Sequence, residues 1–123
     1  MANPNILGAT TIYGNTTYLI PATTAATAWT ALTPAANTVH KIENITVSNV
    51  TGNAVPITLS VNSSTAGGGT AYRIAYQISV PSNASLIVTD KSTSFYVTET
   101  QSVVATVGTA SALELVASYE AIT

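Results

Sequence analysis

The sequence of 123 residues contains no cysteine. This absence excludes disulfide bonds, thiolate metal sites and a thiol nucleophile. It also argues against a small secreted domain of the kind that disulfides hold together. A single domain of this length is large enough to bury a real apolar core instead.

Charged residues are scarce. Asp, Glu, Lys and Arg make up 7% of the chain, against about 25% in an ordinary soluble domain. The three Lys and Arg residues are too few to neutralise many phosphates, so nucleic acid is not expected as a partner. Ser, Thr and Asn must supply most of the polar surface, and they cost less to desolvate than charges. Such a surface is suited to being covered by neighbouring subunits, although an ordinary Thr-rich β domain is the plainer alternative.

Residues that carry chemistry are equally few. His40 is the only His and Asp90 the only Asp, so a Ser-His-Asp triad or an Asp-rich calcium loop has little to draw on. Glu114 and Glu120 lie about 20 Å apart along one strand face, beyond the roughly 5–10 Å that paired carboxylates need. Asp90 and Lys91 are interpreted as a solvated edge pair, and His40 as structural or incidental. We expect no catalytic residue, no cofactor, no metal site and no enzymatic activity.

Long apolar runs are also missing. Hydrophobic residues make up 46% of the chain, yet no run approaches the roughly 18 residues that span a bilayer. The opening MANPNILGATT has no basic region followed by an apolar stretch. Neither a membrane segment nor a secretory signal is expected.

Residues 70–88, TAYRIAYQISVPSNASLIV, carry the clearest pattern in the chain. Large apolar residues at even positions from Tyr72 to Val80 alternate with small or polar ones, which predicts a strand with one buried face. Pro81 and Asn83 then favour a turn, and residues 86–88 begin a second strand. The pattern predicts a hairpin whose tyrosine face packs inward. A sugar-stacking surface formed by Tyr72 and Tyr76 is the alternative.

The neighbouring segments also read as strands. Residues 39–50 predict a strand with a bulge near Glu43 and Asn44, because the apolar positions change parity there. Residues 51–53 predict a hairpin turn into an alternating strand. Pro56 in that strand indicates an edge strand or an outward-facing bonding position. Three glycines at 67–69 predict a turn, not a phosphate-binding loop, because no Lys-Ser/Thr follows them.

The chain divides into residues 1–37 and residues 38–123. The first part is rich in Ala and Thr, with weak strand candidates at 10–13, 17–20 and 28–32, a break at 14–17 and a core residue in Trp29. It is interpreted as an N-terminal arm or as the first short strands. About seven or eight short strands, spaced by about 8–12 residues, predict a single antiparallel β-sandwich of Ig-like or jelly-roll-like Greek-key type, with an extended N-terminal arm.

Four stretches resemble a family of small virion structural proteins of tailed phages, notably phages of cyanobacteria and other marine bacteria. These stretches are TTIYG near the start, KIENITVSNVTGNAVPITLSV, TAYRIAYQISVP and the closing VASYEAI. The resemblance covers nearly the whole chain, and it implies an all-β virion component assembled in the host cytoplasm. It carries over no catalytic residue, and it leaves the capsid, the neck and the tail open as locations.

The expected function is structural. Capsid decoration comes first, a neck or tail component second, and a carbohydrate- or host-receptor-binding module is the alternative. The expected partners are other copies of the chain and other virion proteins, the major capsid protein above all, with no nucleic acid and no membrane. Arg73, the only Arg, is suited to a bidentate pair with a partner carboxylate, and a solvated Arg is the alternative. The candidate subunit contacts are Arg73, Gln77, Tyr13 and Tyr18.

Overall fold

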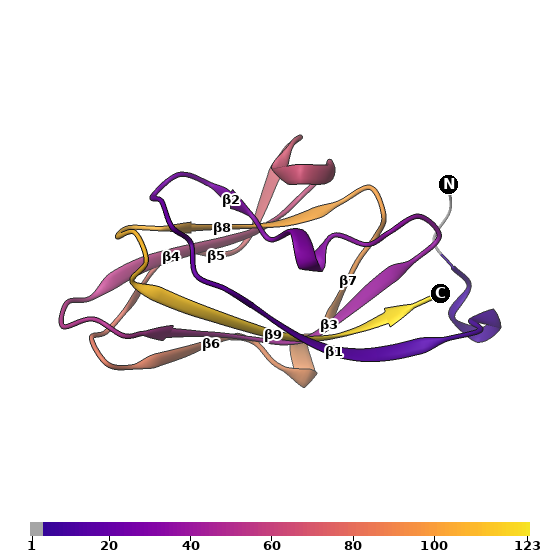
Figure 1. The fold of residues 1–123 in the computed structure, drawn as a ribbon, viewed down its shortest axis with the longest axis horizontal. Coiled ribbons are helices and arrows are strands. Elements are labelled where there is room, and N and C mark those ends of the chain that lie inside the picture. The colour runs from indigo at the N-terminus through magenta and orange to yellow at the C-terminus, as the bar shows by residue number, and fades with distance from the viewer. Residues whose placement is uncertain (1–3) are drawn as a thin grey trace.

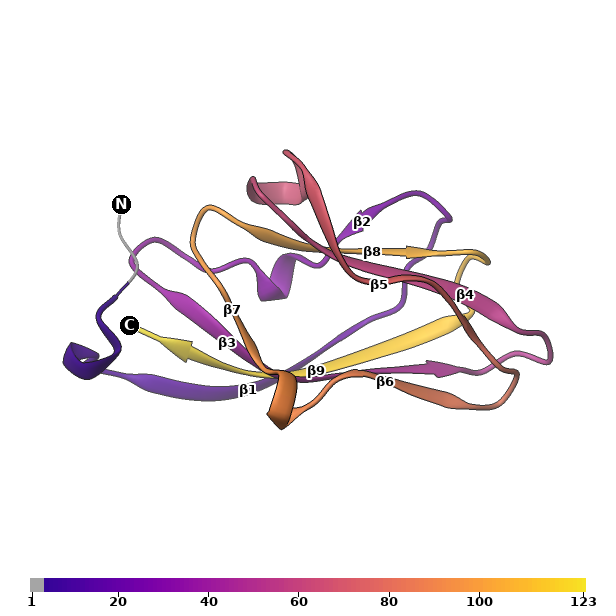
Figure 2. The same cartoon turned by 180° about the vertical axis from the view of Figure 1, so that it is seen from behind.

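The computed structural model describes residues 4–123 as a sandwich of two antiparallel β-sheets, which confirms the expected fold class (Figure 1, Figure 2). There are nine strands and no α-helix among these residues. Sheet A contains, in spatial order, β1 (Ile12–Leu19), β9 (Leu113–Ile122), β3 (Val39–Asn49) and β6 (Ser85–Thr89), with β7 (Phe95–Val97) also paired to β3. Sheet B contains β2 (Thr27–Ala28), β8 (Ser102–Val107), β4 (Val55–Asn62) and β5 (Ala71–Val80). Four single turns of 3-10 helix lie between strands or before β1: η1 (Ile6–Gly8), η2 (Thr30–Leu32), η3 (Thr65–Gly67) and η4 (Lys91–Thr93).

The core lies between the two sheets. Trp29 is 1% exposed, as the sequence predicted, and Leu32 beside it is fully buried. Burial of an aliphatic side chain of this kind contributes about 1.5–3 kcal/mol. The strands add aliphatic side chains from both inner faces, among them Ile42, Ile45, Val47, Ile57, Leu59, Val103, Leu113 and Leu115.

The bulge predicted in β3 is present. The register between β3 and β9 shifts between Ile42 and Asn44, so that Glu43 is the extra residue. Ile42 and Ile45 therefore both face the core, although they stand three positions apart. One inserted residue restores the inward direction of the apolar side chains.

The two predicted hairpins are wrong. Residues 51–53 connect β3 of sheet A to β4 of sheet B, and residues 81–84 connect β5 of sheet B to β6 of sheet A. Both turns therefore pass from one sheet to the other and do not join paired neighbours. A turn signal indicates where the chain reverses, but it contains no information about which strand pairs with which.

Pro56 does not mark an edge strand, because β4 lies between β8 and β5. The carbonyl of Pro56 accepts a hydrogen bond from the Gly108 N–H at 3.0 Å. The nitrogen of Pro56 points to the same side, where β8 has already ended at Val107. Pro56 therefore stands just beyond the end of the β4–β8 ladder, which begins with the pair of Ile57 and Val107.

Residues 12–19 form one continuous strand, and the break expected at 14–17 is absent. β1 pairs with β9 along its whole length, and β2 pairs with Ala105 and Val104 of β8. The candidate strand at 28–32 is mostly the 3-10 turn η2. A Gly-Asn-Thr-Thr stretch favours a turn only in isolation, and here the ladder with β9 keeps it extended.

The loop that contains η3 covers part of the outer face of sheet B. Ser102 is fully buried beneath it. Its hydroxyl donates to the Ser64 carbonyl at 2.7 Å and accepts from the Gly67 N–H at 2.9 Å. Gly67 and Gly69 have φ of 79° and 71°, so two of the three successive glycines adopt the left-handed conformation that glycine tolerates.

Candidate functional site

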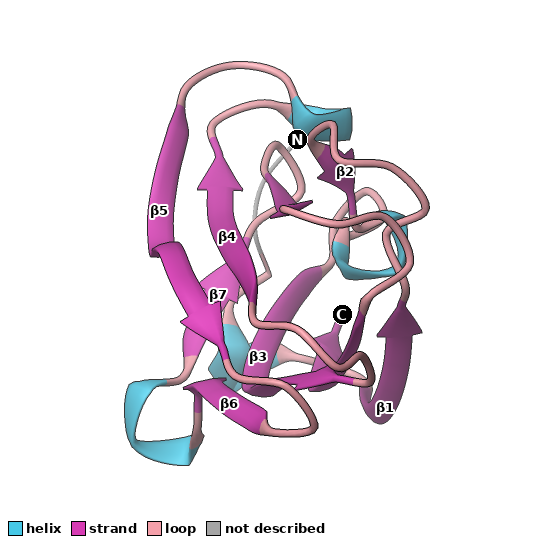
Figure 3. Ribbon diagram, turned by 90° about the vertical axis from the view of Figure 1, so that its left-hand side faces the viewer, coloured by secondary structure: helices cyan, strands magenta, loops and turns pink. Residues whose placement is uncertain are grey.

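The two long edge strands, β1 and β5, lie on opposite sides of the molecule (Figure 3). β5 pairs with β4 alone, and its register is shifted at two places, between Ile57 and Leu59 and between Leu59 and Ser60. We call the unpaired side of this strand the β5 edge, and the unpaired side of β1 the β1 edge.

The expectation that the tyrosine face of β5 packs inward is wrong. Tyr72 is 65% exposed and Tyr76 is 58% exposed. Ile74 and Ile78 between and beyond them are also exposed, whereas Ala75 and Val80 are buried. The irregular register changes which residues face the core, and no further strand of sheet B covers the edge. The result is an apolar, aromatic strip that solvent reaches.

Arg73 and Gln77, two of the candidate subunit contacts, are exposed on the same strand as the tyrosines, although strict alternation would have placed them on its other face. The Arg73 guanidinium carbon is 5.2 Å from the centre of the Tyr76 ring, a cation–π contact worth about 0.5–1 kcal/mol at an exposed site. No carboxylate among residues 4–123 lies within salt-bridge distance of Arg73. Its charge is therefore available to a partner.

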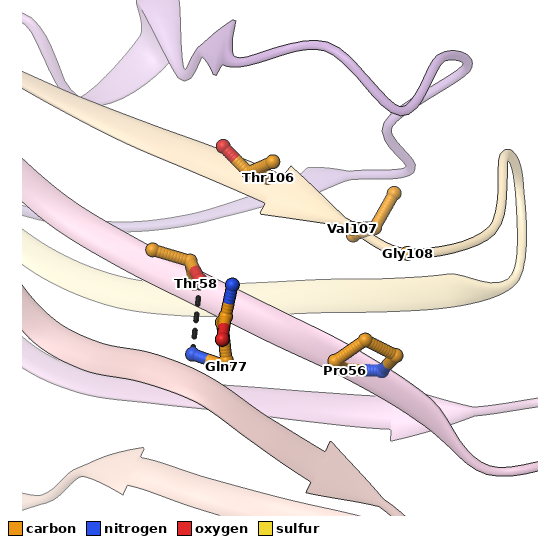
Figure 4. A pocket seen from close by; sticks show the side chains of 6 residues that line it. All are labelled: Pro56, Thr58, Gln77, Thr106, Val107 and Gly108. Atoms are coloured by element: carbon orange, nitrogen blue, oxygen red, sulfur yellow. Dashed lines mark hydrogen bonds between the residues drawn. The ribbon is translucent and has the colours of Figure 1, made fainter.

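Gln77 has a left-handed backbone, with φ of 49°, and its N–H donates to the Thr58 hydroxyl at 3.0 Å. Figure 4 shows its side chain beside a shallow cavity of about 110 Å³ on the outer face of sheet B. Two of the remaining lining residues are Pro56 and Gly108. The cavity is too small for a drug-sized ligand, which occupies about 300–1,000 Å³.

Tyr13 and Tyr18 lie on β1, 63% and 74% exposed. The structure thus places Arg73 and Gln77 on β5 and Tyr13 and Tyr18 on β1, so the four candidate contacts lie on two strands at opposite sides of the sandwich. A second cavity, of about 340 Å³, opens beside β1 and is lined by Tyr18, Ile20, Glu114, Leu115 and Val116. It is mainly apolar, apart from one carboxylate.

His40 is part of the packing. It is 6% exposed, its ring centre is 4.6 Å from that of Tyr119, and its Nδ1 lies 3.0 Å from the Leu32 carbonyl oxygen. Burial lowers the pKa of His40, because the charged imidazolium loses water there, and the hydrogen bond to Leu32 opposes this effect. The side chain is buried and already bonded, so it is poorly placed to take a ligand.

Three charged residues meet on the outer face of sheet A. Lys41 pairs with Glu120 across the β3–β9 ladder, and the Lys41 Nζ is 3.4 Å from Glu43 Oε1. A hydrogen bond between the two carboxyl groups lowers the pKa of Glu43 and raises that of Glu120. This carboxyl pair could not be predicted from the residues alone, because it depends on the strand register that brings Glu120 to Glu43.

Two of the remaining acids, Asp90 and Glu99, accept hydrogen bonds from backbone N–H groups. Asp90 does not pair with Lys91; it caps η4, accepting hydrogen bonds from the N–H and hydroxyl of Ser92 at 3.0 and 2.7 Å. These hydrogen bonds lower the pKa of Asp90. Glu99 is buried and accepts the Asn37 N–H at 2.7 Å. Within residues 4–123 no three His, Asp or Glu side chains are grouped to hold a metal ion, and no helix is long and apolar enough to cross a membrane.

Comparison with known proteins adds a likeness of fold. No family model matches the sequence, and no curated protein matches it either. Among solved structures, the chain is similar to one from the structure titled "Bacillus endospore appendages form a novel family of disulfide-linked pili". The match covers 100% of this chain and 96% of the other, with 19% sequence identity and a TM-score of 0.51. At this identity the likeness shows a shared β-rich fold.

Proposed function

We propose that this protein is a non-enzymatic structural subunit that assembles with copies of itself and with other proteins of a larger particle. The observation that carries the proposal is the pair of long, exposed edge strands on opposite sides of the sandwich, with apolar and aromatic side chains along both. Unpaired strand edges are templates for joining another chain. Two of them on one subunit allow contacts in two directions.

The scarcity of charge supports the same function. With 7% charged residues, the surface offers little electrostatic repulsion between copies. Many weak contacts that symmetry repeats are sufficient to hold a lattice together. The similar structure comes from a pilus described as disulfide-linked. This sequence has no cysteine, so disulfide bonds within it cannot link its subunits.

Within this class, the sequence resemblance favours a tailed-phage virion, with decoration of the capsid first and a neck or tail component second. Quantitative mass spectrometry and image reconstruction of purified particles test this. A copy number that follows the shell lattice supports decoration, and a small ring-sized number supports the neck or tail. Absence of the protein from particles made in infected cells would overturn the virion proposal.

The charge of Arg73 at the β5 edge provides a further test of the proposed contact. The proposed contact predicts that Arg73→Ala lowers incorporation into particles, because a partner carboxylate loses its bidentate donor. Lys91→Ala is the matched control, since it also removes one exposed cation, but from η4. Equal incorporation of the two variants would mean that Arg73 is simply solvated.

A carbohydrate- or receptor-binding module is the second candidate. The exposure of Tyr72 and Tyr76 favours it, because aromatic rings reached by solvent stack on sugar faces and are common at contact surfaces. A glycan array with the intact protein distinguishes the candidates. Specific binding that Tyr72→Ala and Tyr76→Ala abolish, with Tyr96→Ala as a control from sheet A, would favour the binding module over the structural subunit.

A further inference from the structure

The β1 edge lacks every common protection of an edge strand. Natural sheets prevent unwanted pairing with charges, prolines, bulges or very short edge strands. β1 is eight residues long, IYGNTTYL, with no charge and no proline, and its register with β9 is unbroken. β5, in contrast, carries Arg73 and two register shifts. β1 is therefore the edge best suited to regular strand addition.

The hydrogen-bonding direction of each β1 residue follows from one pair at the end of the ladder. Thr11 and Thr123 exchange both backbone hydrogen bonds, at 3.2 and 3.0 Å. Because such pairs alternate along an antiparallel ladder, the odd-numbered residues of β1 direct their N–H and C=O groups toward β9. The even-numbered ones, Ile12, Gly14, Thr16 and Tyr18, direct theirs to the free edge.

We propose that β1 pairs antiparallel with β1 of a second copy of this chain, around a two-fold axis at Asn15. A two-fold pair must place side chains of the same sheet face opposite each other. Centring on Asn15 sets Ile12 opposite Tyr18 and Gly14 opposite Thr16. All four outward-directed residues of both copies are then paired, giving about eight backbone hydrogen bonds. Centring one residue earlier or later leaves some of them without a partner.

The side chains fit this register. On the outer face of sheet A, Ile12 of the second copy lies beside Tyr18, and both side chains are exposed in the single chain. Aromatic–β-branched pairs stabilise neighbouring strands by about 0.2–1 kcal/mol each. The cavity of about 340 Å³ lined by Tyr18, Ile20 and Val116 opens at this place. Symmetry gives one such cavity at each end of the seam, where the opposing Ile12 enters it.

Charge and area indicate a second copy as the occupant. An uncharged strand brings no like charges together when it pairs with itself. The four tyrosines of the two strands are about two-thirds exposed. They contribute at most roughly 400–700 Å² of buried area, at about 150–250 Å² for a whole aromatic side chain. Together with the strand edges, this indicates a small interface, of the class at or below about 1,200 Å² that is typical of weak and transient contacts. The expected dimer is reversible, as a lattice contact should be.

A single engineered cysteine tests the axis, since the chain has none of its own. In the proposed dimer the two Asn15 residues form a non-hydrogen-bonded pair, with Cα atoms about 4.5 Å apart, within the range for a disulfide. Asn15→Cys is therefore expected to form disulfide-linked dimers rapidly under mild oxidation, as seen on non-reducing gels.

Two further cysteine variants fix the register. Thr17→Cys alone should not cross-link. In the proposed register, residue 17 of one copy faces residue 13 of the other, and the two copies of residue 17 are about 14 Å apart. A mixture of Tyr13→Cys and Thr17→Cys should give the mixed disulfide. Asn53→Cys, in an exposed turn, reports random collisions. Cross-linking of Asn15→Cys no faster than that of Asn53→Cys would overturn the proposal.

A proline scan separates association from folding. The N–H of Thr16 points to the free edge, so Thr16→Pro should leave the melting temperature unchanged and weaken self-association about tenfold or more, two hydrogen bonds being lost per dimer. The N–H of Thr17 bonds to β9, so Thr17→Pro should lower the melting temperature. Sedimentation over a wide concentration range measures self-association, and calorimetry measures the melting temperature. Unchanged association of a folded Thr16→Pro variant would contradict the pairing.

This inference rests on the proposed structural function, but the two can fail separately. Loss of the Asn15 cross-link would remove the β1 pairing and leave incorporation into particles to be explained by other surfaces. Absence from particles, with the cross-link present, would remove the virion role and leave a dimer of this chain. Reduced incorporation of the Thr16→Pro variant into particles would show that the β1 pairing contributes to assembly of the particle.

Discussion

Gly108 and Pro56 are in direct contact across the end of sheet B. The Gly108 N–H donates to the Pro56 carbonyl at 3.0 Å, and a Cβ built on Gly108 would lie 2.6 Å from the proline ring carbons. Gly108→Ala should therefore destabilise the fold by about 1–3 kcal/mol, the usual cost of overpacking. Urea denaturation measures this free energy of unfolding.

Gly52→Ala is the matched control, because no atom lies within 4 Å of the Cβ it would add. We expect a change close to zero, or a small gain from the reduced freedom of the unfolded chain. Equal effects of the two substitutions would show that the contact with Pro56 is not what requires glycine at position 108.

Ser102 holds the η3 loop against sheet B, so its removal should free that loop. Ser102→Ala leaves the Gly67 N–H and the Ser64 carbonyl without their partner. We expect a loss of about 1–3 kcal/mol in the free energy of unfolding, with faster amide exchange in residues 63–69. Ser48→Ala removes an exposed bond to Ser85 and serves as the control. Unchanged exchange in the loop would contradict this role of Ser102.

Much of the fold could be predicted from the residues alone. The change of parity between Ile42 and Ile45 indicated the β3 bulge, and the single Trp indicated a core position. Strand pairing could not be predicted, since a turn such as residues 51–53 looks the same whether it joins neighbours in one sheet or crosses to the other. The Glu43–Glu120 pair was missed for that reason.

Which residues of β5 face the core also could not be predicted from the sequence. Alternation from Tyr72 to Val80 correctly indicates a strand, but period two does not say which face is covered or whether the strand is at an edge. Bulges opposite Leu59 then redistribute the faces, so that Ala75 is buried while both tyrosines are exposed. The candidate contact set combined residues from two edges, because no sequence signal separates opposite sides of a sandwich.

His40 should titrate below its ordinary pKa of 6.5, because burial disfavours the imidazolium. A lowered pKa in the folded state means that the unfolded chain binds more protons just below pH 6.5. The stability that neutral His40 provides is therefore complete above 6.5 and is lost as the pH falls below it. NMR of the single His ring gives the midpoint, and His40→Gln should flatten the pH dependence of unfolding in this window. A midpoint at or above 6.5 would contradict the prediction.

Glu120 should affect the pH dependence of stability in the opposite direction to His40. Its pKa is raised above the ordinary 4.5, mainly through the hydrogen bond to Glu43, so its stabilising effect is present below 4.5 and is lost as the pH rises through the raised value. The amide of Glu120→Gln can donate to Glu43 at every pH. We expect a slightly higher melting temperature than that of the native protein at pH 7, and no difference at pH 4. Glu114→Gln, from the same strand, is the control, and equal shifts in both variants would exclude the carboxyl pair as the cause.

The pairing of β1 with β9 has a consequence for synthesis of the protein. Within residues 4–123, β1 pairs with β9 alone, and these are the first and last strands along the chain. While the ribosome is still making residues 20–112, β1 has no strand to bind, and both sides of its backbone are open. Non-local pairing of this kind is slow and exposes chains to aggregation. Sheet A can therefore close only after residues 113–122 have left the exit tunnel, so β1 stays unpaired until the last strand of the sandwich has been made.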